Sequence, residues 1–166
     1  MPIGAMLRNL GSLTHLSVLR TDHSVDNLDR LEEVLNNRNY LRKGRIHPID
    51  VLKALKTYAS GGKVGRSKKT WTPVPRIVDI LEKALEMSFK VVKPTNKVFL
   101  HAVDISGSMS GWVAESVGLT CCEIATAIPL VTAKAEKNYA IRGFSTKFID
   151  LKDQQARLIS FGTKKS

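Results

Sequence analysis

Apolar residues recur every three to four positions along three segments in the first half of the chain. This spacing gathers them on one face of a helix. It predicts helices over residues 25–37, 47–60 and 75–89. The predicted buried faces are Leu28, Leu31, Val34 and Leu35, then Val51, Leu52, Leu55 and Tyr58, then Ile77, Ile80, Leu81, Ala84 and Leu85.

Residues that begin and end helices agree with this pattern. Ser24 is a candidate cap for the first helix, and Pro48 suits the first turn of the second, which Gly61 should end. A further helix over residues 3–13 is weakened by its glycines. Amphipathic helices joined by short loops are typical of a bundle or an α-helical solenoid, and no sequence repeat decides between the two.

The pattern changes after residues 93–97 (KPTNK). The apolar run 98–103 (VFLHAV) predicts a buried parallel strand. A helical stretch follows over residues 115–137, and then two strands over 139–145 and 147–151 with a tight turn between them. Strand, helix and strand form the opening of a doubly wound α/β domain. Such a domain needs more strands than follow here, so a truncated domain is expected, and the tail 159–166 has no evident place in its core.

The net charge of the chain indicates which classes of partner it binds. Among 166 residues, 26 are Lys or Arg and 15 are Asp or Glu, a formal net charge of +11. Such a balance favours nucleic acid first and an anionic membrane surface second. Between residues 38 and 69 a single acid, Asp50, faces ten bases. These bases are Arg38, Arg42, Lys43, Arg45, Lys53, Lys56, Lys63, Arg66, Lys68 and Lys69.

Seven of these bases are candidate RNA contacts: Lys63, Arg66, Lys68, Lys69, Arg42, Lys43 and Arg45. The first four lie on a glycine-containing loop, where the backbone can approach phosphate. The loop lacks the spacing of a nucleotide-binding P-loop. The alternative is a set of solvated helix faces. Trp71 packs between helices or, as the alternative, stacks on a base.

Polar chemistry gathers where the strand 98–103 ends. Asp104, Ser106 and Ser108 form the pattern D-x-S-x-S, which offers one carboxylate and two hydroxyls to Mg²⁺ or Mn²⁺. The alternative is a capped turn whose side chains bond nearby backbone N–H groups. His47 should begin a helix, and His101 should pack against another element. No arrangement of nucleophile and base is visible, so an enzyme is not expected.

The two cysteines, Cys121 and Cys122, are adjacent and fall in an apolar helical segment. Neighbouring cysteines rarely form a disulfide, and core positions in a reducing compartment are expected for both. The chain shows no signal peptide and no apolar run long enough to span a bilayer. We expect a cytoplasmic protein, with the nucleus as a further location, no membrane partner and a monomer.

Three separated segments resemble, in the same order, the Ro 60 kDa family of TROVE-domain RNA-binding proteins. They are residues 5–14 (AMLRNLGSLT), 45–61 (RIHPIDVLKALKTYASG) and 89–109 (FKVVKPTNKVFLHAVDISGSM). Residues 99–111 (FLHAVDISGSMSG) also resemble the first metal-site loop of a von Willebrand factor A-type domain. The likeness extends to about Leu151.

The resemblance implies a HEAT-like helical domain over residues 1–93, followed by an A-type domain over 94–166. The family binds small structured Y RNAs on the outer face of a helical ring, and ends of misfolded RNAs in its cavity. Its metal loop corresponds to Asp104, Ser106 and Ser108. The family also uses a threonine and an aspartate on later loops, and these have no counterpart here; Thr146 is not one.

Two departures from the family follow from the same comparison. The family's counterpart of the first residues is internal, so a fragment is expected that holds the last ring helices and about the first third of the A-type domain. Pro129 should kink or end a helix that the family continues.

Two functions remain. The first is a ribonucleoprotein component that binds small non-coding RNA through the basic helical region. The alternative is an A-type module that binds an acidic protein ligand through its metal ion. The likeness outside residues 99–111 favours the first function.

Overall fold

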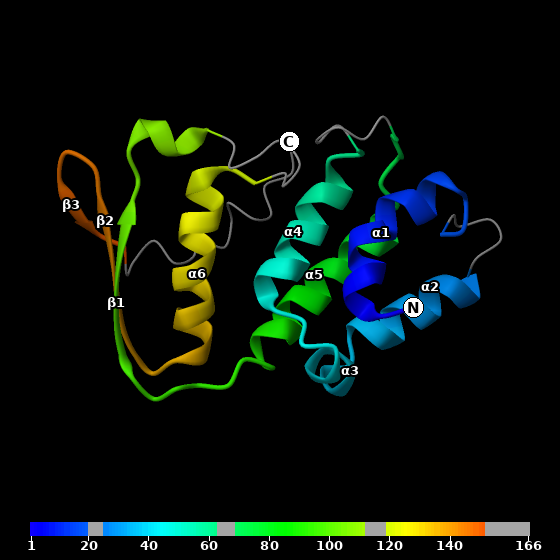
Figure 1. Cartoon of the computed structure of the whole chain (residues 1–166), viewed down its shortest axis with the longest axis horizontal. Helices are drawn as coiled ribbons and strands as arrows, with labels where there is room; N and C mark the ends of the chain where they lie inside the picture. The colour runs from blue at the N-terminus through cyan, green and yellow to red at the C-terminus, as the bar shows by residue number, and fades with distance from the viewer. Residues whose placement is uncertain (20–24, 63–68, 112–118, 152–166) are drawn as a thin grey trace. The chain divides into compact units, whose positions relative to one another are not determined.

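The computed structural model describes residues 1–19, 25–62, 69–111 and 119–151. These residues form two compact units, a helical unit within Met1–Val92 and a sheet unit that starts at Lys93. The described part of the first unit contains helices α1 to α5, and that of the second contains strands β1 to β3 and helix α6 (Figure 1). No described helix is long and apolar enough to cross a membrane.

Five helices make up the helical unit. They are α1 (Ile3–His15), α2 (Val25–Leu35), α3 (Arg38–Lys43), α4 (Pro48–Ala59) and α5 (Pro75–Phe89). All four helices that the apolar pattern predicts are present, whereas α3 was not predicted. Helix α4 packs against both α1 and α5, and α2 packs against α5 (Figure 1).

One apolar core holds these helices together. Its fully buried members come from all of them, and they include Leu10, Leu28, Leu35, Leu41, Val51, Ile77, Ile80 and Leu81. Val34, Leu52 and Leu85 are only partly buried, which corrects the predicted faces. In α4, Ala54 is buried instead of Leu52. A short side chain at that position lets a neighbouring helix approach closely.

Tyr58 of α4 connects three segments of this core. Its side chain is 1 % exposed. The hydroxyl lies 3.0 Å from Oγ1 of Thr14 in α1 and accepts the backbone N–H of Val74, at 3.2 Å, just before α5. Trp71 stacks near the Tyr58 ring, and its Nε1 donates to the Tyr58 carbonyl at 2.9 Å. The prediction that Trp71 packs between helices is therefore confirmed.

The ends of α4 follow the sequence signals. His47 is its N-cap, where Nδ1 accepts the N–H of Ile49 and the Asp50 carboxylate accepts the N–H of His47. This reciprocal pair satisfies N–H groups that have no partner inside the helix. At the other end Gly61 has φ +70°, a conformation that a side chain disfavours. The helix therefore stops where Gly61 predicted.

The sheet unit contains β1 (Val98–Asp104), η1 (Gly107–Ser110), α6 (Cys121–Ala135), β2 (Asn138–Phe144) and β3 (Phe148–Asp150). Strands β1 and β2 are parallel, with Val98 opposite Asn138 and Asp104 opposite Phe144. Strand β3 pairs antiparallel with β2. The predicted strand, helix and strand are confirmed, together with the tight turn that leads into β3.

Helix α6 lies alongside β1 and covers one face of this sheet (Figure 1). Val103 of β1, Ile141 of β2 and Leu151 form the buried cluster there. On the opposite face Val98 and Leu100 are 82 % and 73 % exposed. The sequence predicted a fully buried strand, and this is wrong for the described residues. Periodicity cannot reveal how many faces of an apolar strand are covered.

Helix α6 departs from two predictions. It continues through Pro129, which is buried inside it, so the helix does not end there. Proline removes one backbone N–H donor, and the flanking turns remain helical nonetheless. Cys121 and Cys122 are only partly buried at the start of the helix, where core positions were expected. Burial raises the pKa of the Cys122 thiol, and the nearby Glu123 carboxylate adds to this effect.

Glu136 fixes the chain where it enters the sheet unit. Its buried carboxylate accepts the N–H of Thr95 at 2.6 Å, the Thr95 hydroxyl at 2.8 Å and the N–H of Asn96 at 3.0 Å. The Thr95 N–H is the main cause that lowers the pKa of this carboxyl below its usual value. Asn96 has φ +57°, so these bonds hold a turn that the backbone disfavours.

Two glycines of α1 provide a test of the core. A Cβ on Gly11 would lie 2.4 Å from the Trp71 ring, whereas a Cβ on Gly4 meets nothing closer than 3.8 Å. We expect Gly11→Ala to lower the free energy of unfolding by about 1–3 kcal/mol, because the ring must shift. Gly4→Ala should leave it unchanged or raise it by up to about 1 kcal/mol. Urea denaturation measures both, and equal effects would show that Trp71 does not pack on α1.

Candidate functional site

The described residues place one dense basic surface on the helical unit. We call it the basic turn, residues 38–45, and its exposed side chains include Arg38, Tyr40, Arg42, Lys43 and Arg45. No acidic residue occurs from Val34 to Ile49. Within the described part of the chain, none of these four cations forms an ion pair. Their charge is therefore available to an anion.

Both ends of α3 are capped, which explains how a helix of six residues persists. Asn37 is the N-cap, and its Oδ1 accepts the N–H of Asn39 at 2.9 Å and of Tyr40 at 3.3 Å. Leu41, fully buried in the helical core, anchors the middle. A helix this short is unstable by itself in water, so the caps and Leu41 hold it in place.

Arg45 ends α3 in a conformation that a side chain disfavours. Its N–H bonds the carbonyl of Arg42, and the N–H of Ile46 bonds the carbonyl of Leu41 at 3.0 Å. These two bonds form a Schellman motif, in which glycine usually occupies the left-handed position. Here Arg45 occupies it with φ +52°. A side chain in that region costs about 1 kcal/mol.

Among the described residues, no interaction joins the remaining predicted RNA-binding residues to the basic turn. Lys63, Arg66 and Lys68 lie outside the described residues, so they remain predictions. Lys69 is exposed. Arg42, Lys43 and Arg45 come together on the basic turn, whose helical geometry the sequence did not predict.

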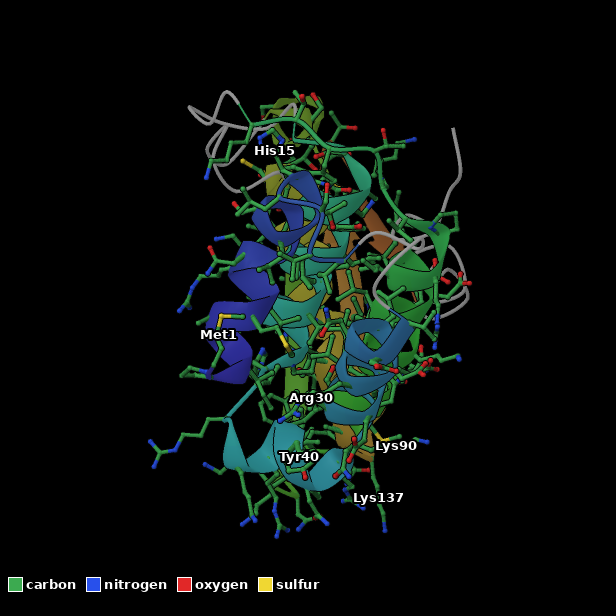
Figure 2. The ribbon with its side chains drawn as sticks, turned by 90° about the vertical axis from the view of Figure 1, so that its right-hand side faces the viewer. Met1, His15, Arg30, Tyr40, Lys90 and Lys137 are labelled. Atoms are coloured by element: carbon green, nitrogen blue, oxygen red, sulfur yellow. The ribbon has the colours of Figure 1, made fainter. Side chains whose placement is uncertain are left out.

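Tyr40 is the residue that the sequence reasoning missed. Its side chain is 42 % exposed, and Lys43, three residues later in α3, is its basic neighbour on the same helix face. Figure 2 labels it on the cyan ribbon of α3. The signal was available in RNYLRKGR (38–45), where an aromatic residue interrupts a basic run. Only Leu41 of this segment follows the apolar period, and the segment therefore escaped a search for amphipathic helices.

The predicted metal loop follows β1 at the carboxyl end of the parallel strands. Asp104 Oδ1 accepts the N–H of Ser106 at 2.9 Å, and Oγ of Ser106 lies 3.0 Å from Oγ of Ser108. Ser110 turns away from this group, since its hydroxyl donates to the Gly107 carbonyl. The structure thus brings Asp104, Ser106 and Ser108 together on one loop.

The bonds within this loop also agree with the capped-turn alternative. The N–H and the hydroxyl of Ser106 stabilise the charged form of Asp104 and lower its pKa below the usual value. The spacing of the two hydroxyl oxygens equals that of neighbouring ligands in an octahedral Mg²⁺ shell, which is about 3 Å for bonds of about 2.1 Å. The three side chains therefore fit part of a cation site, and the remaining ligands would be water or other groups.

One other expectation concerns a side chain of β1, His101. His101 packs toward α6, where its Nε2 lies 2.9 Å from Oγ1 of Thr132, and burial lowers its pKa. Its predicted packing role is confirmed. Among the described residues no group of three or more His, Cys, Asp and Glu side chains could hold a metal ion.

Comparison with known families gives one match in each of the two units. The family model described as the TROVE domain matches residues 1–59, and that of the Ro60 vWA domain matches residues 98–162. The first match covers α1 to α4 and includes the basic turn. The second begins at β1 and includes the Asp104 loop.

Curated relatives support both matches. The RNA-binding protein RO60 of Deinococcus radiodurans is 40 % identical over 95 % of this chain, and that of Caenorhabditis elegans is 36 % identical over 91 %. The crystal structure of the D. radiodurans Ro protein superposes with a TM-score of 0.79 at 38 % identity, over 96 % of this chain and 33 % of that one. The chain spans 31 % and 23 % of the length of the two curated relatives.

The strained Arg45 gives a testable consequence for stability. We expect Arg45→Gly to leave the free energy of unfolding unchanged or to raise it by up to about 1 kcal/mol, because glycine adopts positive φ without a steric cost. Lys43→Gly, at the last residue of α3 and two positions before Arg45, should lower it by about 1 kcal/mol. Urea denaturation of both variants makes the comparison. A loss of stability in Arg45→Gly equal to that in Lys43→Gly would show that Arg45 is not strained.

Proposed function

The chain belongs to the Ro60 family, and we propose that it binds RNA through the basic turn of its helical unit. The observation that carries this proposal is the set of four exposed cations at residues 38–45, with no acidic residue in the sequence from Val34 to Ile49 and no ion pair of these cations among the described residues. Cations held this way neutralise phosphates and release counterions, and this effect supplies most of non-specific nucleic-acid affinity. The two curated relatives are named as RNA-binding proteins, which agrees with this role.

The partner that we propose is a small structured or misfolded non-coding RNA, and the role is binding rather than catalysis. Phosphate contacts fix the position of an RNA without reading its sequence. Recognition of a fold or of a free end suits a surface made of arginines and lysines. We also propose that α1 to α5 belong to a HEAT-like array, in which each helix pair buries its apolar face against its neighbours.

A second role concerns the Asp104 loop. Asp104, Ser106 and Ser108 would hold Mg²⁺ or Mn²⁺, and the ion would supply a positive charge to which an acidic protein ligand could bind. The spacing of the serine oxygens favours this role. The loop offers one carboxylate and two neutral oxygens, which is about half of a six-oxygen shell. We therefore expect the ion to keep several waters and to bind weakly.

RNA binding through the basic turn predicts a steep dependence on salt. Replacing Arg42, Lys43 and Arg45 together by Gln should weaken binding to a small structured RNA, whatever its sequence. The slope of log affinity against log salt should flatten by about 2–3, because each lost phosphate contact removes about 0.7–0.9. Fluorescence anisotropy over a series of salt concentrations measures both effects.

A matched control changes the same charge elsewhere. Lys93, Lys97 and Lys147 are exposed residues of the sheet unit, and their replacement by Gln also removes three charges. This control should retain most of the affinity and most of the slope. If the two triple variants lose affinity and slope equally, net charge rather than the basic turn accounts for binding.

The metal role predicts a selective loss in the Asp104 loop. Calorimetric titration of Mg²⁺ or Mn²⁺ into the protein should give weak binding, with a Kd on the order of a millimolar. Asp104→Ala should abolish it, because no other anionic ligand remains on the loop. Ser110→Ala should not change it, since that hydroxyl bonds Gly107. RNA affinity should survive Asp104→Ala. Equal heats in all three proteins would leave the loop as a capped turn without a metal role.

A further inference from the structure

We propose that Tyr40 is a stacking platform for an unpaired RNA base, and that the cations beside it grip the adjoining phosphates. This inference rests on the proposed RNA-binding function and adds to it a ligand subclass, unpaired nucleotides, together with the residue that would select them. Base stacking on an aromatic ring tolerates every base, since each has a π face. The site would therefore distinguish unpaired from paired RNA without reading sequence.

The setting of Tyr40 separates it from an ordinary exposed aromatic residue. Single exposed apolar side chains are common and carry no information. Tyr40, however, is 42 % exposed on a turn where Arg38, Arg42 and Lys43 are also exposed. Its ring takes no part in the described ring pairs, which involve Tyr58, Trp71 and side chains of the sheet unit. Lys43, at i+3 in α3, shares the helix face of Tyr40, and an aromatic ring with a cation beside it is the combination that single-strand binding surfaces use.

The backbone under Tyr40 is held in place before any ligand arrives. The Tyr40 N–H bonds Oδ1 of Asn37, and the Tyr40 carbonyl accepts the N–H of Gly44 at 2.8 Å. The next residue, Leu41, is fully buried. Binding then orders little besides the side chain itself, which reduces the entropy lost on association. A platform on a mobile loop would lose more.

Arg45 gives an independent observation on the same turn. Helices that end in a Schellman motif usually carry glycine at this position, and here a glycine precedes it at Gly44, which has an ordinary helical φ. The cost of placing a side chain at φ +52° is not offset by any ion pair of Arg45 within the described chain. Strain without a compensating contact is expected where a side chain serves a ligand. Arg45 would thus contact a phosphate next to the stacked base.

Pairing hides the feature that Tyr40 would bind. In an A-form duplex the base faces are stacked on one another, so they are not available to the Tyr40 ring. The cations would still contact a duplex backbone. Tyr40 therefore adds affinity for a single strand only, whereas Arg42, Lys43 and Arg45 add affinity for both forms.

The test uses the full chain and three labelled probes in fluorescence anisotropy at low salt. The probes are a single-stranded RNA of about twelve nucleotides, an abasic strand of the same length, and the first strand annealed to its complement. Tyr40→Ala should lower affinity for the base-bearing strand by about 5- to 150-fold, the range expected for one lost stacking contact. Affinity for the abasic strand and the duplex should be unchanged, as should the salt slope.

Three further variants identify the cause of any loss. Tyr40→Phe keeps the ring and should bind as the wild type. Tyr40→Leu keeps an apolar side chain but has no ring face, and it should lose affinity as Tyr40→Ala does. Arg45→Gly should weaken binding to all three probes and should flatten the single-strand salt slope by about 0.7. Urea denaturation of each variant verifies that the helical unit is intact.

The outcomes separate this inference from the function beneath it. Undiminished binding of the base-bearing strand by Tyr40→Ala, together with loss in the Arg42, Lys43 and Arg45 variant, would overturn the stacking platform and leave RNA binding in place. Equal losses for the base-bearing and abasic strands in Tyr40→Ala would also overturn it. A wild-type chain that binds none of the probes at low salt would remove the proposed function and this inference together.

Discussion

The buried hydroxyl of Tyr58 is the contact on which the helical unit depends. A hydroxyl removed from water costs free energy unless it finds hydrogen-bond partners, and here Thr14 and the N–H of Val74 provide them. These two bonds join α1 and the entry to α5 to α4. Trp71 then closes the same corner through the Tyr58 carbonyl. Leu41 packs in the core that these elements form together. This packing holds α3 in its orientation.

The basic turn can be exposed because only a small part of α3 packs into the core. Leu41 is the one residue of this helix that is buried. The remaining positions face solvent, so they can carry cations and an aromatic ring without disturbing packing. The caps at Asn37 and Arg45 compensate for the small buried area by satisfying backbone groups at both ends. A stable core thus supports a short helix whose surface is free to serve a ligand, and the strain at Arg45 is tolerated because that core is large enough.

The sequence predicted those parts of the fold that periodicity and end signals determine. Four helices, the capping role of His47 and the parallel pairing on either side of α6 were all foreseen. Helix α3 was not, because one buried residue produces no period. Pro129 was expected to kink or end the helix, but α6 does not end there: it continues to Ala135, with Pro129 buried inside it. Exposure of Val98 could not be foreseen, since an apolar strand has the same sequence whether one face or two are covered. The residue types of both candidate sites were readable, but the left-handed Arg45 and the exposed Tyr40 needed coordinates.

The two candidate sites differ in what each requires from outside its own segment. A phosphate needs positive charge and donors, and the basic turn supplies four cations from eight consecutive residues. A divalent cation needs about six oxygens in a defined geometry, and the Asp104 loop supplies three side chains. One oxygen of Asp104 already accepts the N–H of Ser106. That internal bond lowers the pKa of Asp104 and keeps it charged, which favours a cation. The same bond is the one that a capped turn would form. The cations of the basic turn form no ion pair among the described residues. Their charges are therefore the stronger indication of a ligand.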